Sequence, residues 1–236
     1  MVQHLRRHLA IEGGVGAGKS TCLAALAAAF ASDPTVVVLP EPVDSWRACG
    51  ILQRMYDGTA TALEFQLVAI STLAGPLVRA LQGGEVRLVV SERSVQGNRA
   101  VFAAHRLSAT DMATYDVVYS AMLDSLPPRD SFTLYLHAPA SITSQRVAQR
   151  GRPEEAALPP SFHVGLHDRH LAYLASLDRH HGHGLVDAAS GAAEVAGAVC
   201  AVAAALLRGE PPIVPGTVQA PAAAARAGRP SPPSPP

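Results

Sequence analysis

Apolar residues along the chain gather into short runs that alternate with longer stretches rich in alanine and leucine. The short runs predict strands at 9–12, 35–39, 86–90, 132–136 and 185–186. The longer stretches predict helices at 19–31, 59–81, 141–149, 161–177 and 192–207, the second with an interruption near Pro76. Strands separated by helices favour parallel pairing with right-handed crossovers. The pattern therefore predicts an α/β fold with a five-stranded parallel sheet flanked by helices.

Polar residues stand at the ends of two of these strands. Glu41 follows the second predicted strand, and Ser91, Glu92 and Arg93 follow the third. Open parallel sheets bind ligands at the carboxyl ends of their strands. We therefore expect these side chains to face one active cleft.

The length of 236 residues and the hydrophobic content of 48% suffice for one sizeable core. After residue 208 the composition changes to proline, alanine and glycine, which cannot bury enough apolar surface to order a chain. We expect one domain over residues 1–208 and a disordered tail over residues 209–236.

The charges of the chain balance, with 19 basic and 19 acidic side chains. No overall field would draw the protein to nucleic acid or to an anionic membrane, so neither partner is expected. No apolar run reaches the roughly 18 residues that a membrane span needs. The first predicted strand begins near His8, which leaves no room for a targeting segment. We expect a cytoplasmic protein.

Cysteine and histidine give no sign of a metal site. The three cysteines lie far apart without a C-x-x-C pattern, which argues against a disulfide framework and against a zinc site. His180, His181 and His183 lie close together, but glycines surround them and no acidic or thiol ligand has suitable spacing. We interpret this segment as a solvated loop.

The clearest motif lies between the first predicted strand and the helix that follows it. Gly13, Gly18, Lys19 and Ser20 match the pattern G-x-x-x-x-G-K-[ST], in which backbone amides approach phosphates, lysine adds a positive charge and serine reaches Mg²⁺. Lys19 is the only lysine of the chain. We predict a P-loop that binds the phosphates of ATP through Gly13, Gly14, Val15, Gly16, Ala17, Gly18, Lys19, Ser20 and Thr21.

Other residues narrow the class of P-loop protein. A GTPase would need an N-K-x-D guanine reader and a D-x-x-G motif, whereas the only asparagine is Asn98 and no aspartate has a glycine three residues later. Glu41 and Trp46 belong to the sequence E-P-V-x-x-W directly after the second predicted strand. A carboxylate there can take a proton from an acceptor hydroxyl, and a large ring can wall off a substrate. A kinase is therefore favoured over a switch protein.

Three arginines form a candidate lid. Arg146 and Arg150 are four residues apart and share one face of a predicted helix, and Arg152 follows them. Gly151 and Pro153 indicate a mobile segment beyond the helix. Phosphoryl transfer needs cations around the γ-phosphate. We therefore expect the three arginines to close over the triphosphate.

In these motifs the sequence resembles the deoxynucleoside kinase family, which includes deoxycytidine, deoxyguanosine and mitochondrial thymidine kinases, the broad-specificity insect enzyme and viral thymidine kinases of this type. The resemblance runs from about residue 11 to residue 188. It is carried, in family order, by 11–21, 41–46, Phe65-Gln66, 91–94 with Arg99 and Phe102, and 150–155. It implies the P-loop nucleoside and nucleotide kinase fold with an arginine-rich lid.

The reaction that this resemblance implies is transfer of a phosphoryl group from ATP to the 5′-hydroxyl of a deoxynucleoside. Glu41 corresponds to the family's general base, Arg93 lies near the same hydroxyl, and Lys19 acts on the phosphates. Ser20 and Glu92 are expected to hold Mg²⁺, partly through water. Family members pair through helices, so a homodimer is expected, while no partner is indicated for the tail.

The nucleoside pocket is implied by the same resemblance. Phe65 stacks on the base and Gln66 reads it, while Tyr56 and Glu155 bind the sugar 3′-hydroxyl. The remaining nucleoside contacts are implied for Glu41, Trp46, Arg93, Asn98 and Phe102.

Two positions depart from the deoxycytidine kinases of the family. Asn98 stands where those enzymes carry an aspartate, and Leu73 replaces an arginine. An asparagine amide can accept from the cytosine amino group or donate to the thymine carbonyl. We therefore expect an enzyme that favours pyrimidines and accepts thymidine and deoxycytidine.

Two alternatives remain open. A thymidylate kinase shares the P-loop, lid and fold, but that family resembles E-P-G-G-T where this chain has Glu41 to Trp46. A nucleotide-binding scaffold without catalysis could dock its proline-rich tail on partner domains that recognise extended segments. The presence together of Lys19, Glu92, Arg93 and the lid arginines argues against the scaffold.

Overall fold

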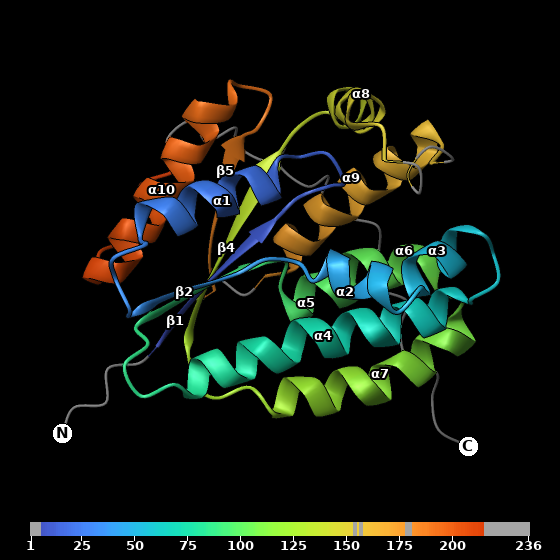
Figure 1. Cartoon of the computed structure of the whole chain (residues 1–236), viewed down its shortest axis with the longest axis horizontal. Coiled ribbons are helices and arrows are strands. Elements are labelled where there is room, and N and C mark those ends of the chain that lie inside the picture. The colour runs from blue at the N-terminus through green and yellow to red at the C-terminus, as the bar shows by residue number, and fades with distance from the viewer. Residues whose placement is uncertain (1–5, 153–154, 156–157, 178–180, 215–236) are drawn as a thin grey trace, which may run out of the picture.

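The structure is a computed structural model that describes residues 6–152, 155, 158–177 and 181–214. Within this part of the chain, five parallel strands form one sheet in the order β2-β3-β1-β4-β5 (Figure 1). The strands are β1 (Arg7–Glu12), β2 (Val36–Leu39), β3 (Leu88–Glu92), β4 (Asp130–His137) and β5 (Gly182–Asp187). The predicted α/β fold with a five-stranded parallel sheet is confirmed.

The central strands β1 and β3 are buried on both faces, as a parallel sheet covered by helices on both sides requires. Leu9 and Ile11 of β1 and Val89 and Val90 of β3 have no exposed surface. The register pairs Ile11 with Glu92. The loops that follow β1 and β3 therefore start side by side at the carboxyl edge of the sheet.

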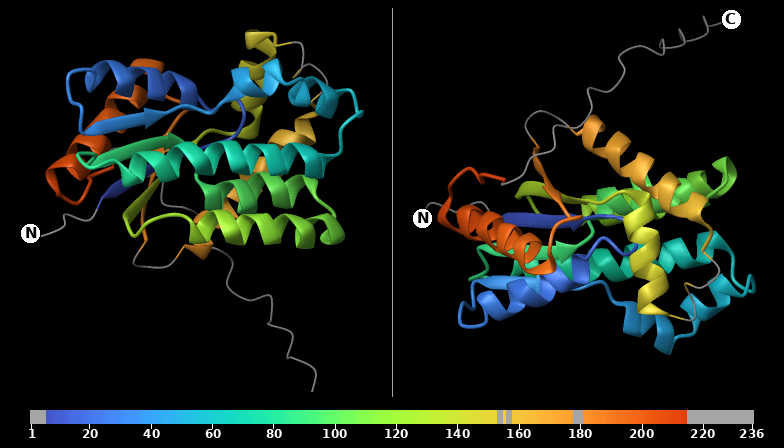
Figure 2. Two further views of the ribbon diagram at one scale, coloured as in Figure 1. Left: turned by 60° about the horizontal axis from the view of Figure 1, so that its bottom comes forward. Right: turned by 90° about the horizontal axis from the view of Figure 1, so that it is seen from above.

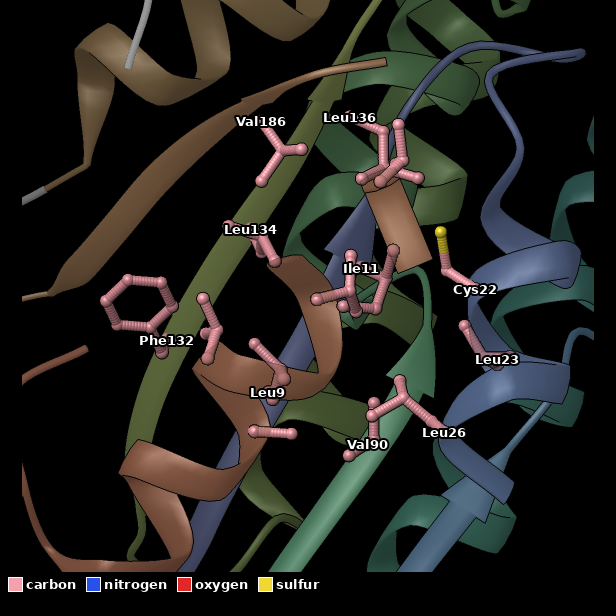
Figure 3. Packing of buried hydrophobic residues seen from close by; sticks show 14 of the residues in the cluster. Leu9, Ile11, Cys22, Leu23, Leu26, Val90, Phe132, Leu134, Leu136 and Val186 are labelled. Carbon is pink, nitrogen blue, oxygen red and sulfur yellow. The ribbon is translucent and has the colours of Figure 1, made fainter. Parts of the chain in front are cut away.

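Two helices cover one face of the sheet and pack on each other. They are α1 (Lys19–Ala29) and α10 (Ala192–Arg208). Figure 3 shows the core between them and the sheet, where Leu9 and Leu134 from the strands meet Leu26 from α1. Burial of one such leucine stabilises the fold by about 1.5–3 kcal/mol.

The opposite face carries the longest helix, α4 (Ala62–Gln82), with α7 (Ala109–Asp124) packed outside it (Figures 1 and 2). Ile70 and Leu77 of α4, Val89 of β3 and Tyr115 of α7 form a second apolar cluster. One continuous helical segment runs between β3 and α7 and packs on α9. It comprises α5 (Val95–Gly97), the π-helix η1 (Asn98–Ala103) and α6 (Ala104–Arg106), and α9 spans Pro160–Ser176.

Three shorter helices lie towards the carboxyl ends of the strands (Figure 1). They are α2 (Val43–Ala48), α3 (Ile51–Tyr56) and α8 (Ala140–Arg150). The first two pack on each other, and α8 packs on α9. The motifs that the sequence places after β2 and β4 therefore surround the same edge of the sheet as the P-loop.

Helix α4 differs from its prediction at both its start and its middle. The Thr61 hydroxyl accepts from the backbone N–H of Glu64 at 3.1 Å, and the Glu64 carboxylate accepts from the Thr61 N–H at 2.7 Å, so the helix begins after Thr61. It then continues through Pro76, and the predicted interruption is wrong. A proline inside a helix costs about 3 kcal/mol, and burial of Ala74 and Leu77 beside it offsets this cost.

The chain does not leave the core at residue 208. The N–H of Glu210 donates to the Ala205 carbonyl at 2.9 Å, and Val214 packs so closely on Gly184 that a Cβ at that glycine would lie 2.5 Å from the valine Cγ2. Glu210 and Val214 are therefore in contact with the domain. Residues 215–236, the rest of the predicted tail, lie outside the described residues.

The predicted solvated loop of histidines is wrong for His183, which is exposed but belongs to a strand. His183 lies within β5, and His181 Nε2 lies 2.9 Å from the Thr133 hydroxyl in β4. Pairing of β5 with β4 brings this segment into the sheet edge. His180 lies outside the described residues.

Candidate active site

The P-loop joins β1 to α1 and turns on two glycines in the left-handed region. Gly16 has φ 87° and Gly18 has φ 98°. A Cβ at Gly16 would lie 2.5 Å from the Thr143 carbonyl oxygen of α8, so only glycine allows this close approach. The loop therefore delivers its backbone amides to the amino end of α1, where anions are stabilised.

Lys19 folds back over this loop. Its Nζ donates to the carbonyl oxygens of Gly13 at 2.9 Å and Gly14 at 3.1 Å. Burial lowers the pKa of Lys19 from its ordinary value, while the carboxylates of Glu92 and Glu41 act in the opposite direction. These donor bonds can be exchanged for bonds to phosphate oxygens.

Glu92, the last residue of β3, connects the P-loop with the acceptor side of the cleft. The Ser20 hydroxyl lies 3.2 and 3.3 Å from the two Glu92 carboxylate oxygens, and the Glu41 N–H lies 3.4 Å from one of them. Among the described residues, no three His, Cys, Asp or Glu side chains gather into a metal-binding group. A pair of oxygen ligands completed by water and phosphate suits Mg²⁺. Ser20 and Glu92 therefore fit a magnesium ion held largely by the nucleotide.

Arg93 faces Glu41 across the cleft. Its Nη2 lies 2.7 Å from Glu41 Oε1, a close ion pair that lacks hydrogen-bond alignment. Its Nη1 donates to Asn98 Oδ1 at 2.9 Å, and its guanidinium carbon lies 3.3 Å from the centroid of the Phe102 ring. The two charged side chains are only 6% and 13% exposed. The pair is therefore held in one geometry at the wall of the cleft.

The backbone of Arg93 is also unusual. Its φ is 71°, and within the described residues it is the only non-glycine residue with positive φ. Such a conformation costs about 1–3 kcal/mol and persists only where the surroundings enforce it. Strain of this kind gathers at active sites.

A cavity of about 310 Å³ opens among these residues at the carboxyl edge of the sheet. It brings together most of the residues predicted to bind ATP or the nucleoside. These are Val15, Gly16, Gly18, Lys19, Ser20, Thr21, Glu41, Trp46, Tyr56, Phe65, Gln66, Glu92, Arg93, Phe102, Arg150, Arg152 and Glu155.

The aromatic wall of the cavity comes from α2 and α4. The ring centroids of Trp46 and Phe65 lie 5.3 Å apart at an interplanar angle of 74°, an edge-to-face contact. The Trp46 indole N–H donates to the Thr72 hydroxyl at 2.9 Å. This hydrogen bond fixes a ring that is only 3% exposed.

Asn98 differs from its predicted role as a nucleoside contact. It has no exposed surface and does not line the cavity. Its Nδ2 donates to Gln66 Oε1 at 3.2 Å and to the Tyr115 hydroxyl at 2.9 Å, while its Oδ1 accepts from Arg93. Asn98 therefore lies behind the wall, bonded to two residues that do line the cavity.

The lid arginines divide between two cavities. Arg150 Nη2 lies 2.6 Å from both Glu155 oxygens, and Arg152 Nη1 lies 3.4 Å from one of them. Arg146 Nη1 instead donates to the Ala188 carbonyl at 2.8 Å. Arg146 and Arg150 line a second cavity of about 250 Å³ beside α1 and the start of α10, together with Ala188 and Ser190. The two cavities meet at the P-loop, because Gly16, Gly18 and Thr21 line both.

The residues predicted for the site and the residues that line the cavity are not the same set. The predicted residues Gly13, Gly14, Ala17, Arg146 and Asn98 do not line the main cavity, and neither does Leu73. Residues that line it without having been predicted are Pro40, Val43, Asp44, Arg47, Leu52, Met55, Ala62, His105, Arg106, Phe162 and Leu166. Only those close to the E-P-V-x-x-W motif carried a sequence signal, because α6 and α9 reach the cavity through tertiary packing.

No helix in the described part of the chain is both long and apolar enough to span a bilayer.

Known proteins resemble the chain over most of its length. It is 28% identical over 180 residues to a probable deoxycytidine kinase of fowlpox virus, and the aligned region covers 74% of each chain. It is 28% identical over 175 residues to mitochondrial thymidine kinase 2 of Homo sapiens, covering 70% of this chain and 63% of the human one. A thymidine kinase of ictalurid herpesvirus 1 is 29% identical over 177 residues, covering 71% and 74%.

The model of the deoxynucleoside kinase family matches residues 9–191. These residues contain the P-loop, the Glu41–Arg93 pair, the aromatic wall and the lid. The family uses ATP as phosphoryl donor and deoxynucleosides as acceptors. The chain belongs to the deoxynucleoside kinase family, and it is an enzyme that phosphorylates deoxynucleosides.

Proposed function

We propose that the enzyme phosphorylates the 5′-hydroxyl of pyrimidine deoxynucleosides, with Glu41 as the general base and magnesium-bound ATP as the donor. The observation that carries this proposal is the Glu41–Arg93 pair at 2.7 Å, which lines the same cavity as Lys19. A base and a phosphate grip in one cavity are what in-line transfer to a hydroxyl requires.

On the acceptor side, the 5′-hydroxyl enters beside Glu41, and the carboxylate takes its proton as the oxygen attacks phosphorus. Arg93 orients the carboxylate and places positive charge where the attacking oxygen becomes more negative. A nucleoside monophosphate would instead bring an anion against a carboxylate that is only 13% exposed. This supports a nucleoside over the monophosphate substrate of a thymidylate kinase.

On the donor side, the P-loop amides and Lys19 hold the triphosphate, and Arg150 and Arg152 approach it from the lid. Ser20 and Glu92 would hold Mg²⁺, which supplies charge neutralisation on the phosphate oxygens. The second cavity, lined by Ala188 and Ser190, extends from the P-loop and is the place we assign to the donor base. Both arginines are bonded to Glu155. This supports a link between the lid and the sugar 3′-hydroxyl that we assign to Glu155 and Tyr56.

The orientation of Gln66 is compatible with a pyrimidine base. A guanidinium only donates, so Arg93 fixes Asn98 with Oδ1 towards it and Nδ2 towards Gln66. Gln66 must then turn its Oε1 towards Asn98, which leaves Nε2 to donate to a base. Cytosine and thymine each offer an acceptor beside a donor, in opposite order along the base edge, so each can pair with Nε2 and the second lone pair of Oε1 in its own placement, and the fixed amide suits one of them better. Phe65 and Trp46 supply the rings against which a base packs.

The experiment is a substrate panel. Purified protein is incubated with magnesium-ATP and one acceptor at a time, namely thymidine, deoxycytidine, deoxyadenosine, deoxyguanosine or thymidine monophosphate, and ADP is measured. We expect turnover of both pyrimidine nucleosides. A preference for purines would contradict the assigned base, and turnover of the monophosphate alone would contradict the assigned acceptor.

We further propose that the enzyme is a homodimer, as the family resemblance implies. Helix α7 packs outside α4 and leaves Val117 72% exposed. Light scattering after size exclusion is expected to give twice the chain mass, and a monomer would contradict the proposal.

A further inference from the structure

Glu12, the last residue of β1, is a buried carboxyl group to which no role has so far been given. It has no exposed surface and stands directly before the P-loop. One of its oxygens, Oε1, accepts from the Ser94 N–H at 2.8 Å and from the Ser94 hydroxyl at 2.6 Å. Ser94 follows Arg93. A single carboxyl oxygen therefore joins the start of the P-loop to the left-handed turn that carries Arg93.

The rest of that turn is held by backbone and hydroxyl contacts. The Arg93 N–H donates to the Ile11 carbonyl at 3.0 Å, and the Ser91 hydroxyl donates to the Arg93 carbonyl at 2.8 Å. The Ser94 hydroxyl also accepts from the Gly97 N–H at 2.7 Å, which caps the segment that follows. The turn is therefore fixed on the β1 side by Ile11 and Glu12 together.

Gly97 leaves room for the Glu12 carboxyl group. A Cβ at this position would lie 2.1 Å from Glu12 Oε1 and 2.6 Å from the carboxyl carbon. No side chain larger than hydrogen fits there without displacing the carboxyl group.

The second oxygen, Glu12 Oε2, is buried without a hydrogen-bond partner, and so is His170 Nε2 on α9. The two atoms face each other at 3.9 Å. His170 Nδ1 lies 2.7 Å from the Leu166 carbonyl, which only accepts, so Nδ1 carries a proton. A neutral His170 then presents the lone pair of Nε2, which an ionised carboxylate would repel. A proton on Glu12 Oε2 removes this repulsion and turns an O–H towards the lone pair, at a separation of 3.9 Å that is longer than a hydrogen bond.

The surroundings favour this neutral arrangement. Burial raises the pKa of Glu12 above its ordinary value, although the Ser94 hydrogen bonds and the charges of Arg93 and Lys19 act against it. Burial also lowers the pKa of His170 to about 3; the hydrogen bond to the Leu166 carbonyl acts against this, and the charges of Lys19, Arg93 and His167 act with it. The Tyr135 ring stacks on His170, the Phe102 ring packs edge-on against it, and the Tyr173 hydroxyl lies 3.4 Å from the Ser94 hydroxyl.

We propose that Glu12 is a positioning residue that works in its protonated form, clamping Ser94 through Oε1 and facing neutral His170 with its Oε2. The clamp makes the P-loop and the Arg93 turn one rigid unit, so that the phosphate grip and the Glu41–Arg93 pair keep a fixed separation. The inference rests on the proposed function in the part that Arg93 plays.

The first experiment compares Glu12→Gln with Glu12→Asp by steady-state kinetics. Glutamine keeps the accepting oxygen and donates through its amide, so kcat is expected to stay within about threefold of the wild type. Aspartate keeps the acid but is one methylene too short to reach Ser94 in place. We expect kcat to fall about 100-fold while the KM for ATP changes little, as for a misplacement of about 1 Å. An active aspartate variant beside an inactive glutamine variant would overturn the proposal.

A double-mutant cycle tests whether Glu12 acts through Arg93. Glu12→Asp is combined with Arg93→Lys, and melting temperatures confirm that each variant is folded. If Glu12 positions Arg93, the double variant loses little more kcat than Arg93→Lys alone. Effects that multiply would reduce Glu12 to a general structural role and overturn the proposal.

A spectroscopic measurement is independent of catalysis. In protein labelled with ¹⁵N-histidine, the His170 signal is identified by its loss in His170→Phe. We expect a neutral ring with the proton on Nδ1 from pH 6 to pH 8. A cationic His170 in this range would place an ionised Glu12 beside it and overturn the clamp. If the wild type transfers no phosphate, the proposed function fails, and this spectrum still decides on the clamp.

Discussion

The guanidinium of Arg93 lies 2.7 Å from the carboxylate of Glu41, although the two residues follow different strands. Glu41 comes after β2 and Arg93 after β3, and β3 lies between β2 and β1 in the sheet. The P-loop starts at the end of β1. Three neighbouring strand ends therefore supply the proposed acceptor base, the cation beside it and the P-loop.

The first prediction concerns Glu41→Gln. The amide cannot accept the proton of the acceptor hydroxyl, so kcat is expected to fall by about 10²–10⁴-fold. The P-loop is untouched, and ATP binding measured by calorimetry should stay within about twofold of the wild type. Asp44→Asn is the matched control, because Asp44 also lines the cavity but is 98% exposed. Turnover of Glu41→Gln close to that of the control would show that Glu41 is not the base.

A second prediction concerns the metal. Glu92→Gln removes the charge from the oxygen pair that Ser20 and Glu92 present, so more Mg²⁺ is needed for half-maximal activity. We expect an increase of about 10-fold or more in that concentration, measured by titration at fixed ATP. Glu64→Gln changes a carboxylate at the start of α4, away from the P-loop, and should leave the requirement unchanged. An equal requirement in both variants would contradict the magnesium assignment.

A third prediction follows from the orientation of Gln66. In Asn98→Asp the new carboxylate accepts from Arg93 and can no longer donate to Gln66. The Gln66 amide then turns over, and its oxygen faces the base. Because thymine and cytosine present inverse donor and acceptor patterns, the preference between thymidine and deoxycytidine should shift by about 10-fold towards the base that the wild type disfavours.

The control for this exchange is Tyr115→Phe, which removes a hydroxyl that also bonds to Asn98 but leaves Arg93 and Gln66 in place. The ratio of kcat/KM for the two nucleosides should stay at its wild-type value in this variant. A ratio that does not move in Asn98→Asp would mean that Asn98 leaves the Gln66 amide unchanged.

The fold could be predicted because each strand contains an apolar run and long helices such as α4 and α10 carry an apolar face. Helix α7 escaped prediction for a physical reason. It packs outside α4, and Tyr115 is the only one of its residues that is fully buried, so its sequence lacks a strong period. The π-helix over Asn98–Ala103 has no sequence signal either, because its geometry depends on the contacts of Asn98 and Phe102.

The functional site, like the fold, could be predicted from the sequence only in part. Residues at strand ends, such as Glu41 and Glu92, could be placed from the sequence because parallel strands bring their carboxyl ends together. The position of Asn98 could not, since its spacing within the motif does not reveal whether the side chain faces the cavity or the core. The partnership of Glu12 with His170 joins β1 to a helix about 160 residues away, and no local pattern reports such a contact.

The last prediction is a pH dependence of stability that His8 contributes. His8 Nε2 lies 2.8 Å from the Ser91 hydroxyl, which itself donates to the Arg93 carbonyl, so His8 must be the donor. Burial lowers the pKa of His8 from 6.5 to about 3. Between these values the unfolded chain binds a proton that the folded chain does not. The free energy of unfolding therefore falls as pH decreases from 6.5 towards 3, by about 1.4 kcal/mol per pH unit for this histidine.

His8→Gln removes the titration and keeps an N–H that can donate to Ser91. Urea unfolding followed by circular dichroism between pH 4.5 and 6 should give a slope that is smaller than the wild-type slope by about 1.4 kcal/mol per pH unit. His183→Gln, at an exposed position of β5, controls for the loss of a histidine and should retain the wild-type slope. The carboxylates titrate in all three proteins, so their contribution to the pH dependence of the free energy of unfolding cancels when the slopes are compared. Parallel slopes for His8→Gln and the wild type would mean that His8 is protonated in the folded state and does not donate to Ser91 as a neutral ring.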